Sequence, residues 1–403
     1  PGIWITGLGT EYPCHIFGPE SFETFAERLY GPNKPGVRKL SPVIMHALIT
    51  ISSIQKLLNI NRNTGIKTRS AIIDYSLDHA ADSMPSSIED MDHLFRTAGV
   101  DMTVKACKKA IEEWSGHPAD ITHTVAVTCT NQGNPGFDVL VNEKLGLSPS
   151  VDRTLLHGVG CAGGLAIMRT AAQLACGATV RNRPARILCF ACELCTPNIR
   201  YELDAVAKCT GTSQVSIGSV LFSDAAAAFV LCNDLGLRKE DKPLFELLDW
   251  TTQLIPGTSK DLQFHAEAKA GYRTVLHRSV PKHAISAVGP MFETLLAALK
   301  TQTRNQNLNI RDFDWALHPG GQAIIDGVRQ AMGLTEEQLR ATREIYRHRG
   351  NSSSPTVLAV LDELRSMPTH RNLVVAAAFG PGMTAEMSCI KTCFAQGNHQ
   401  AKL

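Results

Sequence analysis

The sequence lacks an excess of charge of either sign and lacks long apolar runs. Its 40 Lys and Arg residues nearly balance 38 Asp and Glu, which gives a net charge of +2, so bulk charge does not drive binding to nucleic acid or to a membrane surface. No segment approaches the roughly 18 uninterrupted apolar residues of a membrane span. The opening PGIWITGLGTEYP has neither the basic start nor the apolar core of a signal peptide. We therefore expect a cytoplasmic protein without a nucleic-acid or membrane partner.

The sequence also lacks the signals of a disulfide framework. Its 12 cysteines are scattered, and several lie within apolar, strand-like runs, which is typical of reduced thiols in an intracellular protein. With 44% apolar and 19% charged residues, the chain has the composition of a folded globular protein. Its 403 residues are enough for two packed domains or for one large duplicated unit.

Short apolar runs alternate with glycine turns in the first half of the chain. Continuous runs of this kind predict strands that are covered on both faces, and they span 123–130, 186–193 and 225–232. Residues 161–176, between the first two runs, contain few polar side chains and predict a helix that is buried nearly all round. We expect residues 78–120 and 196–218 to be surface insertions.

The second half shows the same order of elements without repeating the letters. DFDWAL (312–317) predicts a short strand, GQAIIDGVRQAMG (321–333) predicts a helix with Gly333 as its C-cap, and NLVVAAAFGPGM (372–383) predicts a last buried strand. In NSSSPTVLAVLDELRS, Asn and Ser stand at capping positions of a predicted amphipathic helix. Residues 392–403 are predicted to form a polar tail.

Cys161 lies between glycines at the start of the predicted buried helix, in GVGCAGG. A thiol at a helix N-terminus feels the positive end of the macrodipole, which favours the thiolate. The surrounding glycines let substrate and backbone N–H groups come close to the sulfur. This residue is therefore a candidate nucleophile. The alternative is a small buried hydrophobe near a helix start, since free cysteines are commonly just buried.

Two further polar residues stand at strand-to-helix turns. His318 precedes Pro-Gly-Gly, and Asn351 lies between Gly350 and three serines. Taken alone, His318 is a structural hydrogen-bonding residue and Asn351 is a plain helix cap. Together with Cys161 they form a specific combination, because a cysteine nucleophile needs a base or imidazolium partner and an amide can complete an oxyanion site.

The segment CFACELCTP contains a rival site with Cys189, Cys192 and Cys195. Its two C-x-x-C steps look like part of a ferredoxin-type cluster motif. That motif needs a fourth cysteine at position 199, which is Ile199. The first two cysteines also lie in a predicted strand, which directs them to opposite faces. We therefore expect no metal site.

A basic cluster in KLLNINRNTGIKTRS contains Lys56, Arg62, Lys67 and Arg69. Its ordinary interpretation is a solvated surface face. The functional interpretation is a phosphate grip at the mouth of a tunnel, because both Lys and Arg serve as phosphate donors. The pattern alone leaves both open.

These motifs make the chain resemble the type III polyketide synthases of the chalcone synthase family, within the thiolase-type condensing enzymes. The resemblance runs from about residue 50 to residue 390 and is carried by VGCAGGLAIMR, LFSDAAAAFVL, LHPGGQAIID, RGNSSSPTVLAVLDELR and AFGPGMTAE. The spelling GCAGG is closest in character to fungal members. The resemblance implies an α/β protein with a duplicated, five-layered α/β/α/β/α thiolase-like fold that forms a homodimer. It places the cysteine in an N-terminal half, 1–240, and the histidine and asparagine in a C-terminal half, 241–403.

The resemblance also implies a reaction. Cys161 as thiolate, paired with His318 as imidazolium, attacks an acyl-CoA starter. His318 and Asn351 then hold the thioester oxygen of malonyl-CoA while it loses carbon dioxide, and the carbanion attacks the acyl-enzyme. Repetition gives a tri- or tetraketide that cyclises to a pyrone or a resorcinol. Acyl-CoA and malonyl-CoA are the substrates, and no metal or other cofactor is implied.

Further positions carry over from the family. Phe222 matches a gatekeeper phenylalanine between the CoA tunnel and the cavity, while Thr274 stands where the family has its second gatekeeper phenylalanine. We expect this threonine to widen the cavity and to favour aliphatic over coumaroyl starters. Asn134 matches a residue that crosses to the neighbouring subunit's cavity, and Ala378 replaces a glycine of the GFGPG loop. The other substrate-contacting positions implied by the family are Lys56, Arg62, Cys129, Thr130, Gly320, Gly321, Ala323, Ser353, Phe379, Gly380 and Pro381.

Two other functions stay open. A ketoacyl synthase that performs a single condensation shares the cysteine, histidine and asparagine, but it needs acyl carrier protein and stops at a diketide. The Gly-Pro-Gly at 380–382 favours the polyketide branch. An inactive scaffold member of the superfamily is the third possibility, and loss of one of the three residues would indicate it.

Overall fold

The computed structural model describes residues 2–30, 53–76, 85–209, 215–268, 271–368 and 371–393. Its strands are β1 (Ile3–Glu11), β2 (His15–Phe17), β3 (Arg69–Ala71), β4 (His123–Val127), β5 (Asp152–Leu156), β6 (Arg186–Leu194), β7 (Asp224–Asn233), β8 (Phe245–Leu254), β9 (Leu262–Glu267), β10 (Gly271–Leu276), β11 (Phe313–Leu317), β12 (Leu373–Gly380) and β13 (Thr384–Thr392). Its helices are α1 (Pro19–Tyr30), α4 (Ile88–Leu94), α5 (Val100–Trp114), α6 (Phe137–Leu145), α7 (Gly163–Val180), α8 (Ile199–Ala207), α9 (Gly218–Leu221), α10 (Val280–Thr303), α11 (Gln322–Met332), α12 (Arg340–Arg349) and α13 (Thr356–Ser366). Residues 53–63 are also helical.

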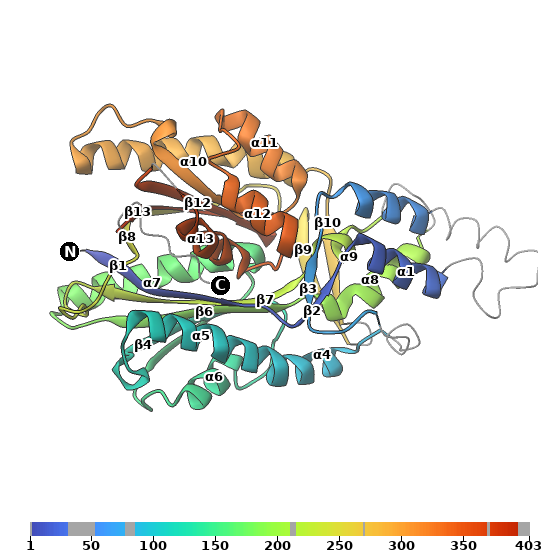
Figure 1. The fold of residues 1–403 in the computed structure, drawn as a ribbon, viewed down its shortest axis with the longest axis horizontal. Coiled ribbons are helices and arrows are strands. Elements are labelled where there is room, and N and C mark those ends of the chain that lie inside the picture. The colour runs from blue at the N-terminus through green and yellow to red at the C-terminus, as the bar shows by residue number, and fades with distance from the viewer. Residues whose placement is uncertain are drawn as a thin grey trace, which may run out of the picture.

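Helices and sheets alternate in five layers (Figure 1). The main sheet has nine strands in the order β11-β12-β13-β8-β1-β7-β6-β4-β5. The pairing between β1 and β8 is short, because it consists of Trp4 with Glu246 and Ile5 with Phe245. This short pairing joins the two parts of the sheet, β11-β12-β13-β8 and β1-β7-β6-β4-β5. The helices α7 and α13 lie between the two parts of the sheet, while α10 and α11 cover the upper part and α5 and α6 cover the lower part (Figure 1). The expected α/β/α/β/α arrangement is confirmed.

The layers are held together by three apolar cores. The middle core packs α7 and α13 against strands from both parts of the sheet. All ten residues of β7 are buried, as expected for a strand covered on both faces. Cys189 belongs to the middle core and Cys192 to the lower core, so their side chains point to opposite faces of β6. The strands predicted around 123–130, 186–193 and 225–232 are all present.

The helix α5 shows that the prediction of a surface insertion over 78–120 was wrong for the described residues 85–120, while 78–84 lie outside the described residues. Ala106, Ala110 and Trp114 on one face of α5 are fully or almost fully buried. The helix lies so close to β1 that a Cβ atom at Gly7 would be 2.0 Å from the carbonyl oxygen of Ala110. The exposed residues Lys105, Lys108 and Glu112 of KACKKAIEEW concealed this face, because they occupy the opposite one.

Two smaller predictions also need correction. Residues 196–218 contain α8, whose Leu203 and Val206 are buried, so this stretch is not a simple surface insertion. The helix α13 follows Pro355 and has no side-chain cap, so Asn351 and the serines do not cap it. Gly333 does end α11 in the left-handed conformation, as predicted, with φ of 65°. Residues 394–403 of the predicted tail lie outside the described residues.

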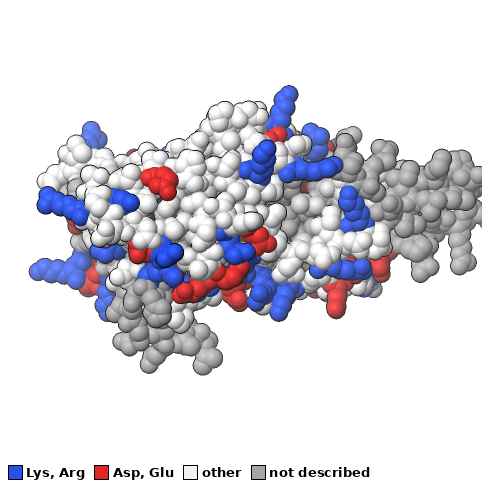
Figure 2. Space-filling view, turned by 90° about the horizontal axis from the view of Figure 1, so that it is seen from above, with Lys and Arg blue, Asp and Glu red and all other residues white. Residues whose placement is uncertain are grey.

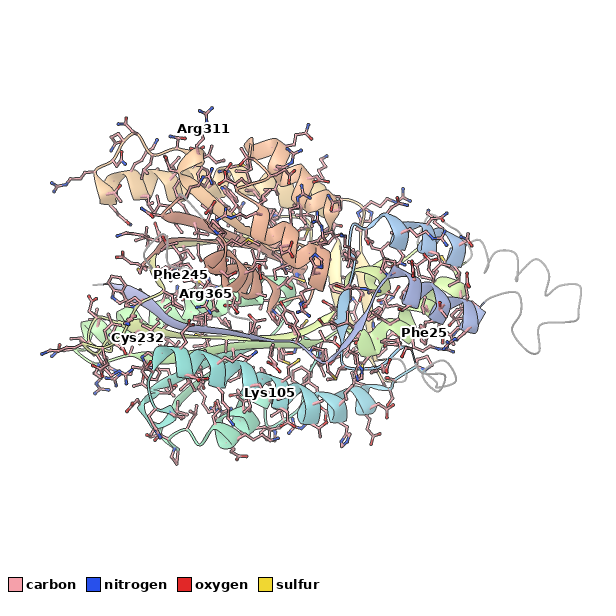
Figure 3. The ribbon with its side chains drawn as sticks, in the orientation of Figure 1. Phe25, Lys105, Cys232, Phe245, Arg311 and Arg365 are labelled. Atoms are coloured by element: carbon pink, nitrogen blue, oxygen red, sulfur yellow. The ribbon has the colours of Figure 1, made fainter. Side chains whose placement is uncertain are left out.

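Arg365 connects the middle layer to the lower layers (Figure 3). It extends from α13, forms an ion pair with Glu113 of α5 and donates a hydrogen bond to the carbonyl oxygen of Leu8 in β1 at 3.1 Å. Glu113 in turn accepts from the N–H of Leu8 at 2.9 Å. One arginine and one carboxylate thus satisfy backbone groups of β1 close to the shift in its pairing with β7 between Ile5 and Gly7.

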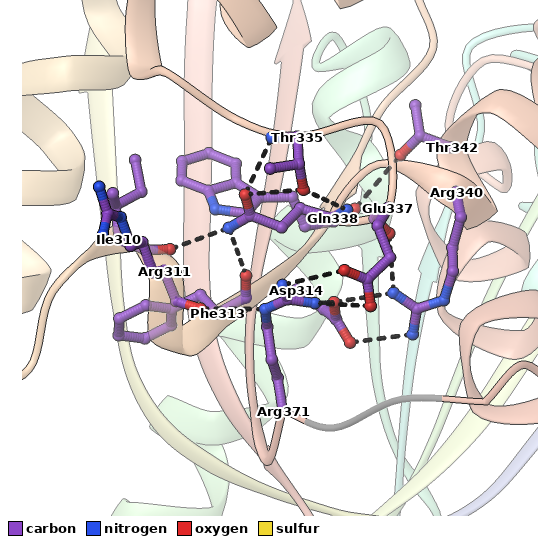
Figure 4. A network of polar contacts seen from close by, with 11 residues as sticks. Ile310, Arg311, Phe313, Asp314, Thr335, Glu337, Gln338, Arg340, Thr342 and Arg371 are labelled. Carbon is purple, nitrogen blue, oxygen red and sulfur yellow. Dashed lines mark hydrogen bonds and ion pairs between the residues drawn. The ribbon is translucent and has the colours of Figure 1, made fainter.

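A buried polar network holds β11 in place (Figure 4). The carboxylate of Asp314, which is 1% exposed, accepts from Arg340 at 2.8 and 2.9 Å and from Arg371 at 3.1 Å. The side-chain amide of Gln338 donates to the carbonyl oxygens of Ile310 and Phe313 at 3.0 and 2.8 Å. These contacts fix the strand that leads into His318.

The surface carries both signs of charge. Lys and Arg alternate with Asp and Glu over the face seen from above (Figure 2). Among the described residues, no helix combines the length and apolarity that crossing a membrane requires, and no group of His, Cys, Asp and Glu is arranged to hold a metal ion.

We predict that Asp314→Asn lowers the free energy of unfolding by about 3 kcal/mol. It removes the buried counter-charge of Arg340 and leaves Arg371 with the exposed Glu337. Urea unfolding followed by tryptophan fluorescence measures the loss, with Trp315 next to the substitution. Glu336→Gln is the matched control, since Glu336 also binds two arginines but is 61% exposed. This substitution should lower the free energy of unfolding by only about 0.5 kcal/mol. Equal losses in the two variants would contradict the role assigned to burial.

Candidate active site

Cys161 lies in a single 3-10 turn, Gly160–Ala162, that leads directly into α7. Gly160 has φ of 44°, a conformation that glycine adopts without strain, and a Cβ atom there would lie 2.5 Å from the ring of Pro381. At Gly164 a Cβ atom would lie 2.5 Å from the carbonyl oxygen of Ser354. The glycines around Cys161 therefore let segments from the second half of the chain pack directly against the turn.

The thiol of Cys161 contacts the segment that follows α12. It donates a hydrogen bond to Ser353 Oγ at 3.3 Å, and it also interacts with the side chain of Asn351. The Oδ1 atom of Asn351 accepts from the N–H of Ser353 at 2.8 Å, which leaves the amide NH₂ group directed elsewhere. Asn351 therefore shapes a turn beside the thiol instead of capping a helix.

His318 follows β11 at the same edge of the sheet. Its backbone N–H donates to the carbonyl oxygen of Ala377 in β12 at 2.7 Å, and Thr342 Oγ1 exchanges hydrogen bonds at 3.0 Å with the backbone N–H and carbonyl of Leu317 just before it. The ring is 1% exposed, and neither ring nitrogen has a hydrogen-bond partner among the described residues. Buried polar atoms are normally paired, so this imidazole is available to a substrate.

Burial makes charge costly for both reactive groups. It raises the pKa of the Cys161 thiol to about 11, against the smaller lowering effects of Ser353 and Asn351, and it lowers the pKa of His318 to about 3. The place of Cys161 at a helix N-terminus predicts a thiolate, but the desolvation caused by burial outweighs the effect of the helix end. These pKa shifts favour a neutral thiol and a neutral imidazole at pH 7.

Glu193 is a buried residue of the site that sequence reasoning missed. Its carboxylate accepts from the N–H groups of Cys129 and Thr130 at 3.1 Å, from Thr130 Oγ1 at 2.7 Å and from Ser354 Oγ at 2.6 Å. It thus fastens the loop after β4 to the segment beside Cys161. The available signal was a lone charged residue inside the apolar run CFACEL.

Cys161 lines a cavity. Of the predicted contact positions, Cys129, Phe222, Thr274, Ser353 and Pro381 line it. The others do not. The Thr130 hydroxyl donates to Glu193, and Phe379 is buried in the apolar core that also contains Trp315 of β11. Gly380 packs against Val159, so closely that a Cβ atom at position 380 would lie 2.1 Å from the carbonyl oxygen of Val159.

An aromatic ring that the sequence analysis did not anticipate also lines the cavity. Phe264 of β9 stands directly opposite Thr274 of β10, and it stacks on Tyr272 with ring centroids 4.6 Å apart. Replacement of the second gatekeeper by threonine therefore does not leave the wall without an aromatic side chain.

A separate groove of about 610 Å³ lies on the other side of this wall. The predicted residues Lys56, Gly320, Gly321 and Ala323 line it. Arg62 does not; its guanidinium binds Glu23 at 2.7 and 2.8 Å. The groove and the cavity meet at consecutive residues, because Leu221 lines the groove and Phe222 lines the cavity.

Asn134 lies away from both spaces. It lines a surface hollow together with Leu155 of β5, and Leu155 is 38% exposed. Within the part of the chain that the structure describes, β5 is the last strand of the sheet and its one partner is β4.

Comparison with known proteins identifies relatives over almost the whole chain. Residues 51–235 match the chalcone and stilbene synthase N-terminal domain, and residues 246–393 match the C-terminal domain. The type III polyketide synthase pspB of Penicillium soppii is 52% identical over 98% of this chain and 97% of its own length. The acylalkylpyrone synthase csyB of Aspergillus oryzae is 36% identical over 89% of this chain and 91% of its own.

Solved structures agree with these relatives. A type III pentaketide synthase from Neurospora crassa superposes with a TM-score of 0.87 and 38% identity, covering 97% of this chain and 99% of that one. CsyB in complex with CoA-SH superposes with a TM-score of 0.85 and 34% identity, covering 97% and 100%. Enzymes of this kind are acyltransferases that perform decarboxylative condensation. The chain belongs to the chalcone and stilbene synthase family, as a type III polyketide synthase of the fungal type.

Proposed function

We propose that the chain loads an aliphatic acyl-CoA starter on Cys161, extends it with malonyl-CoA and cyclises the tri- or tetraketide to a pyrone or a resorcinol. The observation that carries this proposal is a thiol bonded to an amide-bearing turn, in a cavity that adjoins a larger groove. The apolar side chains Ile199, Leu262 and Phe264 in the cavity wall suit an alkyl chain. The name of csyB, acylalkylpyrone synthase, points the same way.

The groove suits coenzyme A. Lys56 stands exposed on its rim, where an ammonium group can bind phosphate. The glycines at 320 and 321 bring backbone close to a ligand there. A CoA-bound structure exists for the similar CsyB. The proposed steps use the side chains of the site and the two thioesters, without a metal or other cofactor.

Loading begins with the neutral pair. The thiol proton moves to a ring nitrogen of His318, and Sγ attacks the thioester carbonyl of the starter. The CoA thiolate leaves and takes that proton. Because no described residue bonds the ring nitrogens of His318, the imidazole can accept the proton and then return it.

Extension depends on Asn351 and His318. Their N–H groups donate to the thioester oxygen of malonyl-CoA, where negative charge develops as carbon dioxide leaves. The resulting enolate carbon attacks the acyl carbonyl on Sγ, and the C–S bond breaks. Cys161 leaves as a thiolate that can take back the lengthened chain. Ser353, bonded to both Cys161 and Asn351, keeps nucleophile and amide in register.

We further propose that the enzyme is a homodimer in the cytoplasm. The open edge of β5, the exposed Leu155 beside the Asn134 hollow and the family resemblance support a second copy at this edge. All twelve cysteines are free thiols, which suits a reducing compartment.

The direct test is incubation of the purified protein with malonyl-CoA and a series of acyl-CoAs, with products identified by mass. We expect tri- or tetraketide pyrones or resorcinols that disappear with Cys161→Ala, and higher kcat/KM for fatty acyl-CoA than for coumaroyl-CoA. Diketides alone, or activity only with acyl carrier protein, would indicate the single-condensation enzyme. If no starter gives a product, the remaining interpretation is an inactive scaffold member of the superfamily.

We predict that Asn351→Ala lowers malonyl-CoA decarboxylation on the order of 100-fold, since one oxyanion donor is lost. The single-turnover rate at which acyl-CoA loads Cys161 should stay within about fivefold of the rate of the unaltered enzyme, because the amide is assigned to the extension step. The exposed Asn305→Ala is the matched control and should change neither rate. Equal losses in loading and decarboxylation would mean that Asn351 serves only to hold the turn.

The resting protonation state is testable by alkylation. With the pKa of Cys161 raised to about 11, the thiolate fraction grows about tenfold per pH unit between pH 7 and 9, so iodoacetamide should label this residue faster across that range. Peptide mapping follows Cys161 separately from exposed Cys14 and Cys176. A rate that is already at its plateau at pH 7 would show a thiolate–imidazolium pair in the resting enzyme.

A further inference from the structure

Glu202 is a buried carboxylate in the reaction cavity that the proposed steps do not use. It lies on α8, is 4% exposed and lines the cavity together with Cys161. Its carboxylate lies against Gly218, where a Cβ atom would be 3.2 Å from Oε1. A glutamate is almost never fully buried without a partner, so its place in this wall requires an explanation.

The partners of Glu202 are hydroxyl-bearing residues. Ser216 Oγ donates to Oε2, and Thr274 donates from its side chain and its backbone N–H. Burial is the largest influence and raises the pKa of the carboxyl group, while these hydrogen bonds lower it. A carboxylate has about four acceptor positions, so the bonds from Ser216 and Thr274 leave capacity for a further donor.

The surroundings make this group distinctive. Ile199, Phe222 and Phe264 are among its neighbours in the cavity lining, and an alkyl chain can contact these but cannot satisfy a carboxylate. An incoming hydroxyl donor would form a charge-assisted hydrogen bond, which is about twice as strong as a neutral one. A ligand that covers Glu202 without supplying a donor leaves a buried acceptor unpaired, which costs binding free energy.

We propose that Glu202, held by Ser216 and Thr274, is a subsite that binds an enol hydroxyl of the growing polyketide chain. This inference rests on the proposed function, because only a chain with successive β-keto units supplies such enols. Binding forms and breaks no covalent bond. It holds one extended unit at the wall while the acyl end stays at Cys161, and it thereby favours further extension over early release. Thr274 accordingly contributes a hydrogen-bond donor to the subsite.

The test compares Glu202→Gln and Glu202→Leu with the unaltered enzyme, using malonyl-CoA and its best acyl-CoA starter. The readout is the ratio of the longest product to all shorter products by mass spectrometry. We expect this ratio to fall at least fivefold in both variants, while the rate of starter loading on Cys161 stays within twofold. Glu240→Gln is the matched control, since Glu240 is 66% exposed, and its ratio should not change.

Ser216→Ala separates binding from simple support of the wall. If Glu202 only anchors residue 216, two results follow. Ser216→Ala lowers thermal stability as much as Glu202→Leu does. Glu202→Gln, which keeps the size and an acceptor oxygen, leaves the product ratio unchanged. An unchanged ratio in Glu202→Gln and Glu202→Leu overturns the inference. Where Glu202→Leu does not fold, Glu202→Gln alone decides. If the unaltered enzyme gives no extended product, the proposed function has failed instead.

Discussion

The site depends on one buried carboxylate that ties the two halves of the chain together. Glu193, on β6, binds the backbone after β4 on one side and Ser354 from the second half on the other. Placing an ionisable group at 0% exposure is costly unless its oxygens are hydrogen-bonded; here N–H and hydroxyl groups from both halves donate to them. Ser353, the residue before Ser354, contacts the thiol of Cys161, so the position of this partner of the thiol follows from this junction.

The residues proposed to be catalytic are all buried or half-buried. Ser353 and Asn351 direct hydrogen bonds within the turn beside Cys161, while His318 is held by its backbone and by the strand behind it. In the proposed reaction, charge on these groups is created only when a substrate arrives to share it. Preorganised donors in a medium of low dielectric are most effective in that situation, since they need no rearrangement as charge develops.

Much of this could be predicted from the sequence. Continuous apolar runs identified β4, β6 and β7, and the combination of GCAGG, HPGG and GNSSS placed three polar residues at turns that the fold brings to one edge. Amphipathic helices were harder: the lysines of α5 and the polar residues of α8 concealed faces that only tertiary packing buries. Glu193 and Glu202 could not be predicted, because the sequence around a single glutamate does not show which hydroxyl groups lie beside it in the folded chain. Arg62 shows the converse, since its charge is used by Glu23, and the thiol's protonation followed from burial that no local pattern encodes.

The groove and the cavity are lined by neighbouring residues of the same segments. Leu221 lines the groove and Phe222 lines the cavity; on β10, Leu276 lines the groove and Thr274, two residues before it, lines the cavity. Ile217 lines the groove beside the serine that bonds Glu202. A mutation that enlarges the chamber must therefore also alter the passage through which substrates enter. Starter choice and product length are thus coupled traits in this architecture, and divergence among related enzymes should change them together along this shared partition.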